Sequence, residues 1–175
     1  RDYSLQLDTQ GGAPVLSVFG GKITTYRRLA QDTMPLLVDI FPTMAADWTR
    51  DAHLPGGDFA VTGADDLTRD LMGRYPFLDH SWARRLMRAY GTEAFAVLGD
   101  ARMPGDLGRD FGATLHEREV TWMMENEFAR NAEDVIWRRS KLGLRLGPVE
   151  VAELNRWMQN HAGAGSNSPP QGVAE

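Results

Sequence analysis

Two short stretches near the start of the chain alternate between apolar and polar residues. Tyr3, Leu5 and Leu7 alternate with polar positions, and a second apolar run covers residues 15–19 after a glycine-containing turn. This pattern predicts two β-strands joined by a loop. Because an isolated two-stranded hairpin is marginally stable in water, we expect the strands to belong to a larger sheet. Without it, residues 1–19 should be poorly ordered or paired with another copy. The alternative is a hairpin folded onto the chain's own helices.

A helical period follows, from Thr25 to Phe41. Apolar residues recur there at three- and four-residue spacing, which predicts an amphipathic helix with a buried apolar face. Pro35 lies in the middle of this stretch, and because proline lacks an N–H we expect a kink or a break. The period is lost between residues 42 and 63, where the glycine- and proline-rich residues 54–59 predict a connecting loop.

The remaining chain predicts a series of short helices. The first ends before Pro76, the second begins at Asp79 or Ser81 and stops at Gly91, and another has its N-cap at Asn131. The expected ranges are 65–75, 79 or 81 to 90, 92–98, 114–128, 131–139 and 149–161, with Pro148 at the first turn of the last helix and residues 99–112 as an irregular loop. The fold class is therefore mainly α. Residues 163–175 are polar and are expected to be disordered.

The composition argues against several classes of binding partner and of chemical site. The 175 residues are 42% hydrophobic and 25% charged, which is typical of a globular domain. The net charge of −5 comes from interspersed charges, which argues against nucleic acid as a partner. The sequence contains no cysteine, so it offers no disulfide, thiolate metal site or cysteine nucleophile. No apolar run reaches the roughly 20 residues of a membrane-spanning helix.

The junction between the second strand and the following helix is the strongest candidate for a binding site. Gly20 and Gly21 allow a sharp turn and close approach to a ligand. Thr24 or Thr25 can cap the helix, whose N-terminus then suits an acceptor or anion. Gly21-Lys22 is also similar to the end of a phosphate-binding loop. However, that motif needs a glycine where this sequence has Leu16, and a serine or threonine where it has Ile23.

Other polar clusters favour structural roles. The four histidines have no ligand-like spacing, so no metal site is predicted. His116, Glu117 and Glu119 are interpreted as a solvated helix face rather than as an acid/base site. Asp134 and Arg138 are spaced for an ion pair along one helix. Trp122, Trp137 and Trp157 are interpreted as core and interdomain packing residues rather than as a stacking platform for bases, and Phe128 is expected on the inner face of helix 114–128.

A series of motifs resembles the C-terminal part of the aerobic, FAD-dependent glycerol-3-phosphate dehydrogenase family. The similar segments occur in order along nearly the whole chain, apart from the tail. They are Arg1-Asp2-Tyr3, residues 16–27, Leu54-Pro55-Gly56-Gly57, Arg74-Tyr75-Pro76-Phe77-Leu78, Ala89-Tyr90-Gly91, Leu98-Gly99-Asp100-Ala101, residues 106–112 and residues 133–143.

The resemblance implies a fragment of a larger enzyme. Residues 1–50 would be the last strands and a helix of a truncated FAD-binding α/β domain, and residues 51–162 a helical C-terminal cap domain. The intact parent would oxidise glycerol 3-phosphate to dihydroxyacetone phosphate and pass electrons to quinone. It would be cytoplasmic and peripheral on the inner membrane, with the missing FAD domain and a second copy of itself as further partners. The fragment alone is expected neither to bind FAD nor to be active.

The resemblance also assigns roles to individual residues. Arg1 corresponds to an arginine near the substrate, where a guanidinium suits the phosphate. Lys22 is the candidate catalytic residue and would place a positive charge near the flavin or the substrate. Gly21, Ile23 and Thr24 would join Lys22 in contacting the flavin. The structural alternatives are helix capping for Thr24 and a frayed terminus for Arg1.

The competing interpretation of the whole chain is a helical protein-interaction module without catalysis. In that case the glycine turn would be only structural, and the chain would stand alone.

Overall fold

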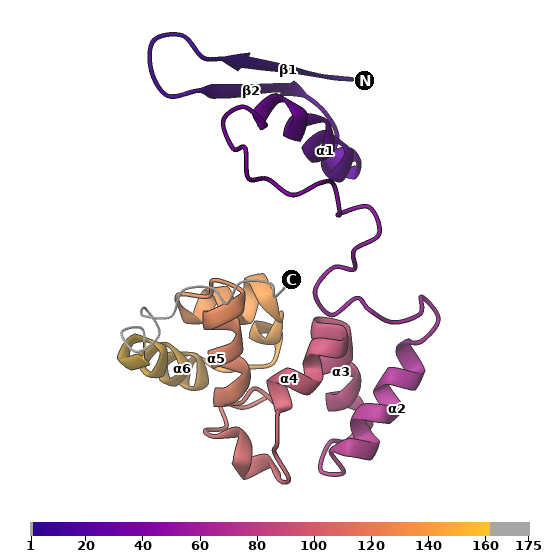
Figure 1. Ribbon diagram of the computed structural model, residues 1–175. Coiled ribbons are helices and arrows are strands. Elements are labelled where there is room, and N and C mark those ends of the chain that lie inside the picture. Colours follow the sequence, from indigo (N-terminus) through magenta and orange to yellow (C-terminus); the bar gives the residue numbers. More distant parts are fainter. Residues whose placement is uncertain (1, 162–175) are drawn as a thin grey trace. The chain divides into compact units, whose positions relative to one another are not determined.

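The computed structural model describes residues 2–161, so Arg1 and the tail predicted at residues 163–175 lie outside the described part. The chain divides into two compact units between His53 and Leu54. The N-terminal unit contains a hairpin and one α-helix, and the larger C-terminal unit is helical (Figure 1). The expected class, mainly α with a small β-hairpin, is confirmed.

The hairpin of the N-terminal unit packs on its own helix. Strands β1 (Tyr3–Asp8) and β2 (Val15–Gly20) pair antiparallel. Alternate residues of β1, beginning with Tyr3, are half-buried, and the Tyr3 hydroxyl donates a 2.5 Å hydrogen bond to Asp32 of α1 (Tyr26–Leu37). The expectation that residues 1–19 need further strands to be ordered was therefore wrong. The alternative, a hairpin folded onto a helix, describes this unit.

The N-terminal unit nevertheless leaves much apolar surface exposed. Helix α1 has no buried residue, and Pro35 does not break it, because the helix ends only at Leu37. The hairpin covers only part of the helix, so the apolar face that the sequence predicts to be buried is largely exposed within residues 2–161. The large apolar side chains that remain exposed in this unit's strands, turn and helix, or directly after the helix, are Val15, Val18, Phe19, Ile23, Tyr26, Met34, Leu36, Val38 and Phe41.

The C-terminal unit contains the short helices that the sequence predicts. Its α-helices are α2 (Ala64–Arg74), α3 (His80–Tyr90), α4 (Ala94–Leu98), α5 (Glu117–Asn126) and α6 (Pro148–His161). Three-residue or four-residue 3-10 helices cover Gly91–Glu93, Pro104–Leu107 and Leu142–Leu144. Residues Asp134–Arg139 form a π-helix, where the sequence predicts an ordinary helical turn.

Local chemistry explains several of these boundaries. Asp79 accepts a 2.8 Å hydrogen bond from the Trp82 N–H and caps α3, and Gly91 ends that helix with φ of 55°. Helix α5 begins three residues later than predicted from Thr114, because Ala113 and Thr114 adopt positive φ values of 49° and 68°. These conformations cannot continue into a right-handed helix.

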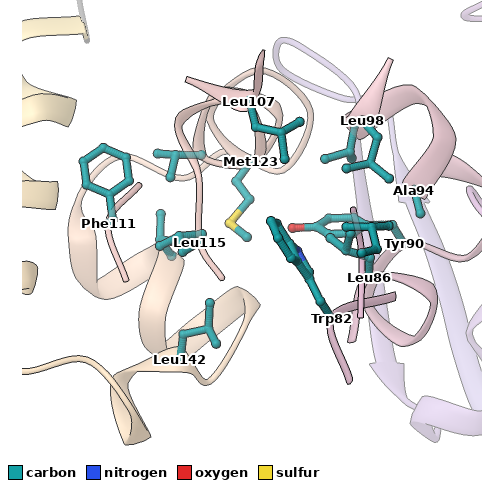
Figure 2. Close-up of a cluster of buried hydrophobic side chains, with 14 of the residues drawn as sticks. Trp82, Leu86, Tyr90, Ala94, Leu98, Leu107, Phe111, Leu115, Met123 and Leu142 are labelled. Atoms are coloured by element: carbon teal, nitrogen blue, oxygen red, sulfur yellow. The ribbon is translucent and has the colours of Figure 1, made fainter. Parts of the chain in front are cut away.

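One hydrophobic core joins the helices of the C-terminal unit. Trp82 and Leu86 from α3 pack with Leu98, Leu115 and Met123 from later segments (Figure 2). The largest fully buried residues also include Tyr75, Leu71, Phe111, Leu154 and Met158. The burial of so many side chains from distant segments gives this unit its own core.

One prediction about an aromatic residue in this unit is wrong. Phe128 is 76% exposed, because the chain turns at positive φ there and leaves the helix. Of the three tryptophans assigned to core and interdomain packing, Trp157 is buried, Trp122 is half-buried and Trp137 is 42% exposed.

Candidate functional site

The turn that follows β2 depends on two glycines. Gly20 and Gly21 have φ values of 84° and 99°, in the region that favours glycine. A Cβ atom at Gly20 would lie 3.0 Å from the carbonyl oxygen of Asp2, and one at Gly21 would lie 3.4 Å from the Leu29 side chain. Both glycines are therefore needed for the backbone conformation of the turn and for its close packing on β1 and α1.

The helix that follows begins with a single 3-10 turn, Ile23–Thr25, which runs into α1. The Thr25 hydroxyl donates a 3.0 Å hydrogen bond to the Lys22 carbonyl, so it does not cap the helix. Thr24 makes no cap either, and the expected capping by one of these threonines is wrong. The first N–H groups of the turn, those of Ile23 and Thr24, have no acceptor within the helix and are available to an external one.

Lys22 lies on the exposed surface of this turn. Its side chain makes no ion pair within residues 2–161, and the neighbouring Ile23 is 89% exposed. Gly21, Lys22, Ile23 and Thr24 are thus gathered in one accessible turn. A lysine ammonium beside two N–H donors fits a carbonyl oxygen or an anionic ring, which is the chemistry that a flavin edge presents. Arg1 lies outside the described residues.

A buried polar network lies in the C-terminal unit, where the sequence predicts a solvated face. Glu119 is only 4% exposed and receives hydrogen bonds of 2.6 and 2.8 Å from Arg85 and of 2.9 Å from the Tyr90 hydroxyl. His116 is also buried and stacks on Trp82 at 5.0 Å. The interpretation of His116 and Glu119 as solvated was wrong, because their partners lie about thirty positions earlier in the sequence.

This network is suited to holding the fold rather than to proton transfer. Burial and the Glu119 carboxylate raise the pKa of Tyr90 far above its ordinary value, so the hydroxyl remains a hydrogen-bond donor. Arg85 also donates to the side chain and carbonyl of Thr114, at 3.0 and 2.9 Å. Helix α3 is thereby joined to the start of α5 by a satisfied ion pair.

Comparison with known proteins gives the family. Residues 48–162 match the model of the C-terminal domain of alpha-glycerophosphate oxidase. This range is more than half of the chain.

The chain belongs to this family.

Similar proteins extend the comparison into the N-terminal unit. The chain is 42% identical over 160 residues to D-erythritol 1-phosphate dehydrogenase of Brucella abortus, and 42% identical over 161 residues to glycerol-3-phosphate dehydrogenase of Pseudomonas aeruginosa. It is 41% identical over 160 residues to aerobic glycerol-3-phosphate dehydrogenase of Escherichia coli.

These matches cover 91%, 91% and 90% of this chain but 32%, 31% and 32% of the relatives. The chain therefore corresponds to about a third of each relative, its C-terminal part. The alignments span 160 or 161 residues, whereas the chain from residue 48 to its last residue has only 128. Each alignment therefore also includes much of the N-terminal unit. The expected resemblance to this part of the glycerol-3-phosphate dehydrogenases is confirmed.

Two glycine motifs of this alpha-glycerophosphate oxidase C-terminal domain meet in the structure. A Cβ atom at Gly56 would lie 2.0 Å from the Tyr90 carbonyl oxygen, and one at Gly91 would lie 1.9 Å from the Gly56 carbonyl oxygen. The Thr92 N–H donates a 3.1 Å hydrogen bond to the same Gly56 oxygen. Close backbone packing between the 54–57 loop and the end of α3 thus requires both glycines.

Two further motifs are also joined by packing. The Tyr75 hydroxyl donates a 2.8 Å hydrogen bond to the Gly99 carbonyl, and Arg118 donates one of 2.6 Å to the Leu98 carbonyl. These contacts give the motif residues of the family domain a structural role. In contrast, the exposed Lys22 side chain makes no hydrogen bond or ion pair within residues 2–161 and is accessible to a ligand, so the 20–25 turn is the candidate functional site.

Residues 2–161 contain no cluster of His, Asp or Glu side chains that could hold a metal ion. Among the helices in that range, none is both long and apolar enough to cross a bilayer.

Proposed function

We propose that this chain is the C-terminal part of an FAD-dependent sn-glycerol-3-phosphate dehydrogenase. The intact enzyme oxidises glycerol 3-phosphate to dihydroxyacetone phosphate and passes the electrons to quinone. The observation that carries this proposal is the 41–42% identity to two bacterial glycerol-3-phosphate dehydrogenases over about nine-tenths of the chain.

The surface of the N-terminal unit supports the assignment to a larger domain. Phe19 and Val15 in β2, and Tyr26 and Phe41 in and after α1, are each more than half exposed. Exposed apolar groups on this scale, in so small a unit, are typical of a surface that is covered by other elements. In our proposal the rest of the flavin-binding sheet covers them, and the fragment alone neither holds FAD nor catalyses.

In this proposal the 20–25 turn contacts the cofactor. FAD, when bound, supplies the group that accepts the hydride from the substrate. The N–H groups of Ile23 and Thr24 bind a carbonyl oxygen at its edge, and Gly21 allows the backbone to approach. The Lys22 ammonium stabilises the negative charge that develops during the reaction, since a preorganised charge acts most strongly where charge appears.

Arg1 has a different role in the proposal. Its guanidinium binds the substrate phosphate, because it can donate two parallel hydrogen bonds to two phosphate oxygens. Arg1 thereby orients the substrate, while Lys22 acts on the reacting centre.

A second candidate substrate is D-erythritol 1-phosphate, because the dehydrogenase of that name is as similar to this chain as the glycerol-3-phosphate dehydrogenases are. Both compounds carry a phosphate, so Arg1 would have the same role with either.

The location of the intact enzyme belongs to the same proposal. We place it in the cytoplasm, peripheral on the inner membrane where quinone is available, and as a homodimer.

The roles of the turn can be tested with Lys22→Met in the complete reading frame that includes this chain. We expect turnover with glycerol 3-phosphate to fall about ten- to a thousandfold, the scale seen when a preorganised group of this kind is lost. Dye reduction is measured per bound flavin, so a loss of cofactor is not mistaken for a loss of catalysis.

Two variants serve as controls for this experiment. Lys22→Arg keeps the charge and should recover part of the turnover, whereas Arg50→Met removes an exposed cation elsewhere in the same unit and should have no effect. Unchanged turnover of Lys22→Met at equal flavin content would refute the assignment of Lys22.

A further inference from the structure

A basic cleft lies on the C-terminal unit, on the opposite face of α3 from the hydrophobic core. Residues of α3 line one side, and Arg139 and Ser140 line the other. On α3 the lining residues His80, Arg84 and Arg88 are spaced four apart, so they form one stripe along the exposed face of the helix. The buried face of the same helix carries Trp82, Leu86 and their neighbours.

The cations of this cleft are poorly neutralised by the protein. Within residues 2–161, Arg84 and Arg88 make no ion pair or hydrogen bond through their side chains. In the same range, the one carboxylate that pairs with Arg139 is that of Glu127, at a long 3.9 Å. No acidic residue lines the cleft, although the chain as a whole has a net charge of −5. Arg85 is the exception, because its charge is already compensated by Glu119.

This arrangement has an energetic cost that a bound anion would relieve. Like charges four residues apart on a helix repel each other, so Arg84 and Arg88 weaken α3 unless an anion lies between them. Guanidinium groups bind phosphate through paired, charge-assisted hydrogen bonds, and Arg84, Arg88 and Arg139 all line this concave surface. The hydroxyls of Ser81 and Ser140 already donate within the protein, at 2.7 and 2.6 Å, so the arginines are the available donors.

We propose that the cleft between α3 and residues 139–140 binds a soluble phosphate-bearing anion through Arg84, Arg88 and Arg139. This site belongs to the helical unit and does not depend on the function proposed for the 20–25 turn. A phosphate on a lipid headgroup has the same chemistry. Binding at a membrane surface, however, favours large apolar residues beside the basic ones, and residues 80–90 expose none.

The test is calorimetric titration of the 175-residue chain with inorganic phosphate, at an ionic strength held constant with chloride. We expect saturable binding that Arg84→Ala/Arg88→Ala weakens at least about tenfold, the loss expected for hydrogen bonds to charged groups. The matched control, Arg102→Ala/Arg145→Ala, removes the same charge from exposed positions outside the cleft and should bind as the unchanged chain does. Circular dichroism confirms that each variant is folded.

A second experiment tests whether the bound phosphate is that of a lipid headgroup rather than of a soluble compound. Vesicles of phosphatidylcholine with and without phosphatidylglycerol are sedimented with the chain, and we expect equal, low retention on both. Absence of saturable phosphate binding, or equal weakening by the control pair, would overturn the proposal. So would retention on the anionic vesicles that is lost in Arg84→Ala/Arg88→Ala.

Discussion

The buried Arg85–Glu119–Tyr90 network gives a sharp prediction about stability. Glu119→Ala removes the acceptor of three hydrogen bonds and leaves the Arg85 charge without its counterion in a site where the side chains are 16% and 5% exposed. Breaking a buried ion pair from one side typically costs 3–5 kcal/mol, so we expect the free energy of unfolding of the helical unit to fall by about 3–5 kcal/mol.

Two milder variants separate the contributions of the hydrogen bond and of the charge to this loss of stability. Tyr90→Phe removes a single hydrogen bond to a charged acceptor and should cost about 1.5–3 kcal/mol. Glu119→Gln keeps the shape but not the charge, so it should lie between Tyr90→Phe and Glu119→Ala. Arg85 retains its hydrogen bonds to Thr114 in every variant. The loss of stability in Glu119→Ala should therefore be smaller than the sum of the three separate hydrogen bonds to Glu119.

The assay is urea unfolding followed by circular dichroism at 222 nm, which reports mainly on the helical unit. Glu125→Ala is the control, because Glu125 lies on the same helix but is exposed, and it should change stability by no more than about 0.5 kcal/mol. A loss below about 1 kcal/mol in Glu119→Ala would show that the ion pair contributes little, and it would refute the reasoning.

Three further predictions concern the helices of the C-terminal unit. The hydrogen bonds from the Trp82 N–H and the Ser81 hydroxyl hold the pKa of Asp79 below its ordinary value of 3.8. The carboxylate therefore stabilises the fold above that value, and this contribution is lost as the pH falls through the lowered pKa. Thermal unfolding between about pH 5 and pH 2 should show a smaller acid-induced fall in Asp79→Asn than in the unchanged chain, and equal falls would contradict the assignment. Gly91→Ala should destabilise by at least about 2 kcal/mol, because φ is 55° and the new Cβ would lie 1.9 Å from the Gly56 oxygen. Gly73→Ala, in open space within α2, should instead stabilise by about 0.5–1 kcal/mol in urea unfolding. A stable Gly91→Ala variant would show that the 54–57 loop can move away.

Local signals in the sequence predicted the helix ends that depend on backbone chemistry. Pro76 ends α2, Asp79 caps α3, and Asn131 accepts a 3.1 Å hydrogen bond from the Asp134 N–H, as its position predicts. The ion pair from Arg138 to Asp134 is present at 2.8 Å. Each of these features involves residues within four positions of each other, so the pattern of the sequence contains all the partners.

Other features were not predictable in this way, some because the partners lie far apart in the sequence and others because the local pattern allows more than one arrangement. The partner of Glu119 is Arg85, thirty-four residues earlier, and nothing in the local pattern indicates that the two meet. The π-helix arises where the Val135 carbonyl accepts bonds from both the N–H and the hydroxyl of Ser140, at 3.0 and 2.6 Å. In the candidate site, the Gly20-Gly21 turn followed from sequence, but the role of Thr25 did not, because its hydroxyl bonds back to Lys22 instead of capping α1.

Purification of the product of the complete reading frame that includes this chain tests whether the chain belongs to a flavin-dependent dehydrogenase. We expect a flavin absorbance spectrum and dye reduction that depends on glycerol 3-phosphate, measured beside D-erythritol 1-phosphate at equal concentration. Higher activity with D-erythritol 1-phosphate would change the substrate assignment but keep the enzyme class. A frame that begins with a methionine just before Arg1, or a longer product that holds no flavin and reduces no dye, would contradict the account and favour a helical interaction module.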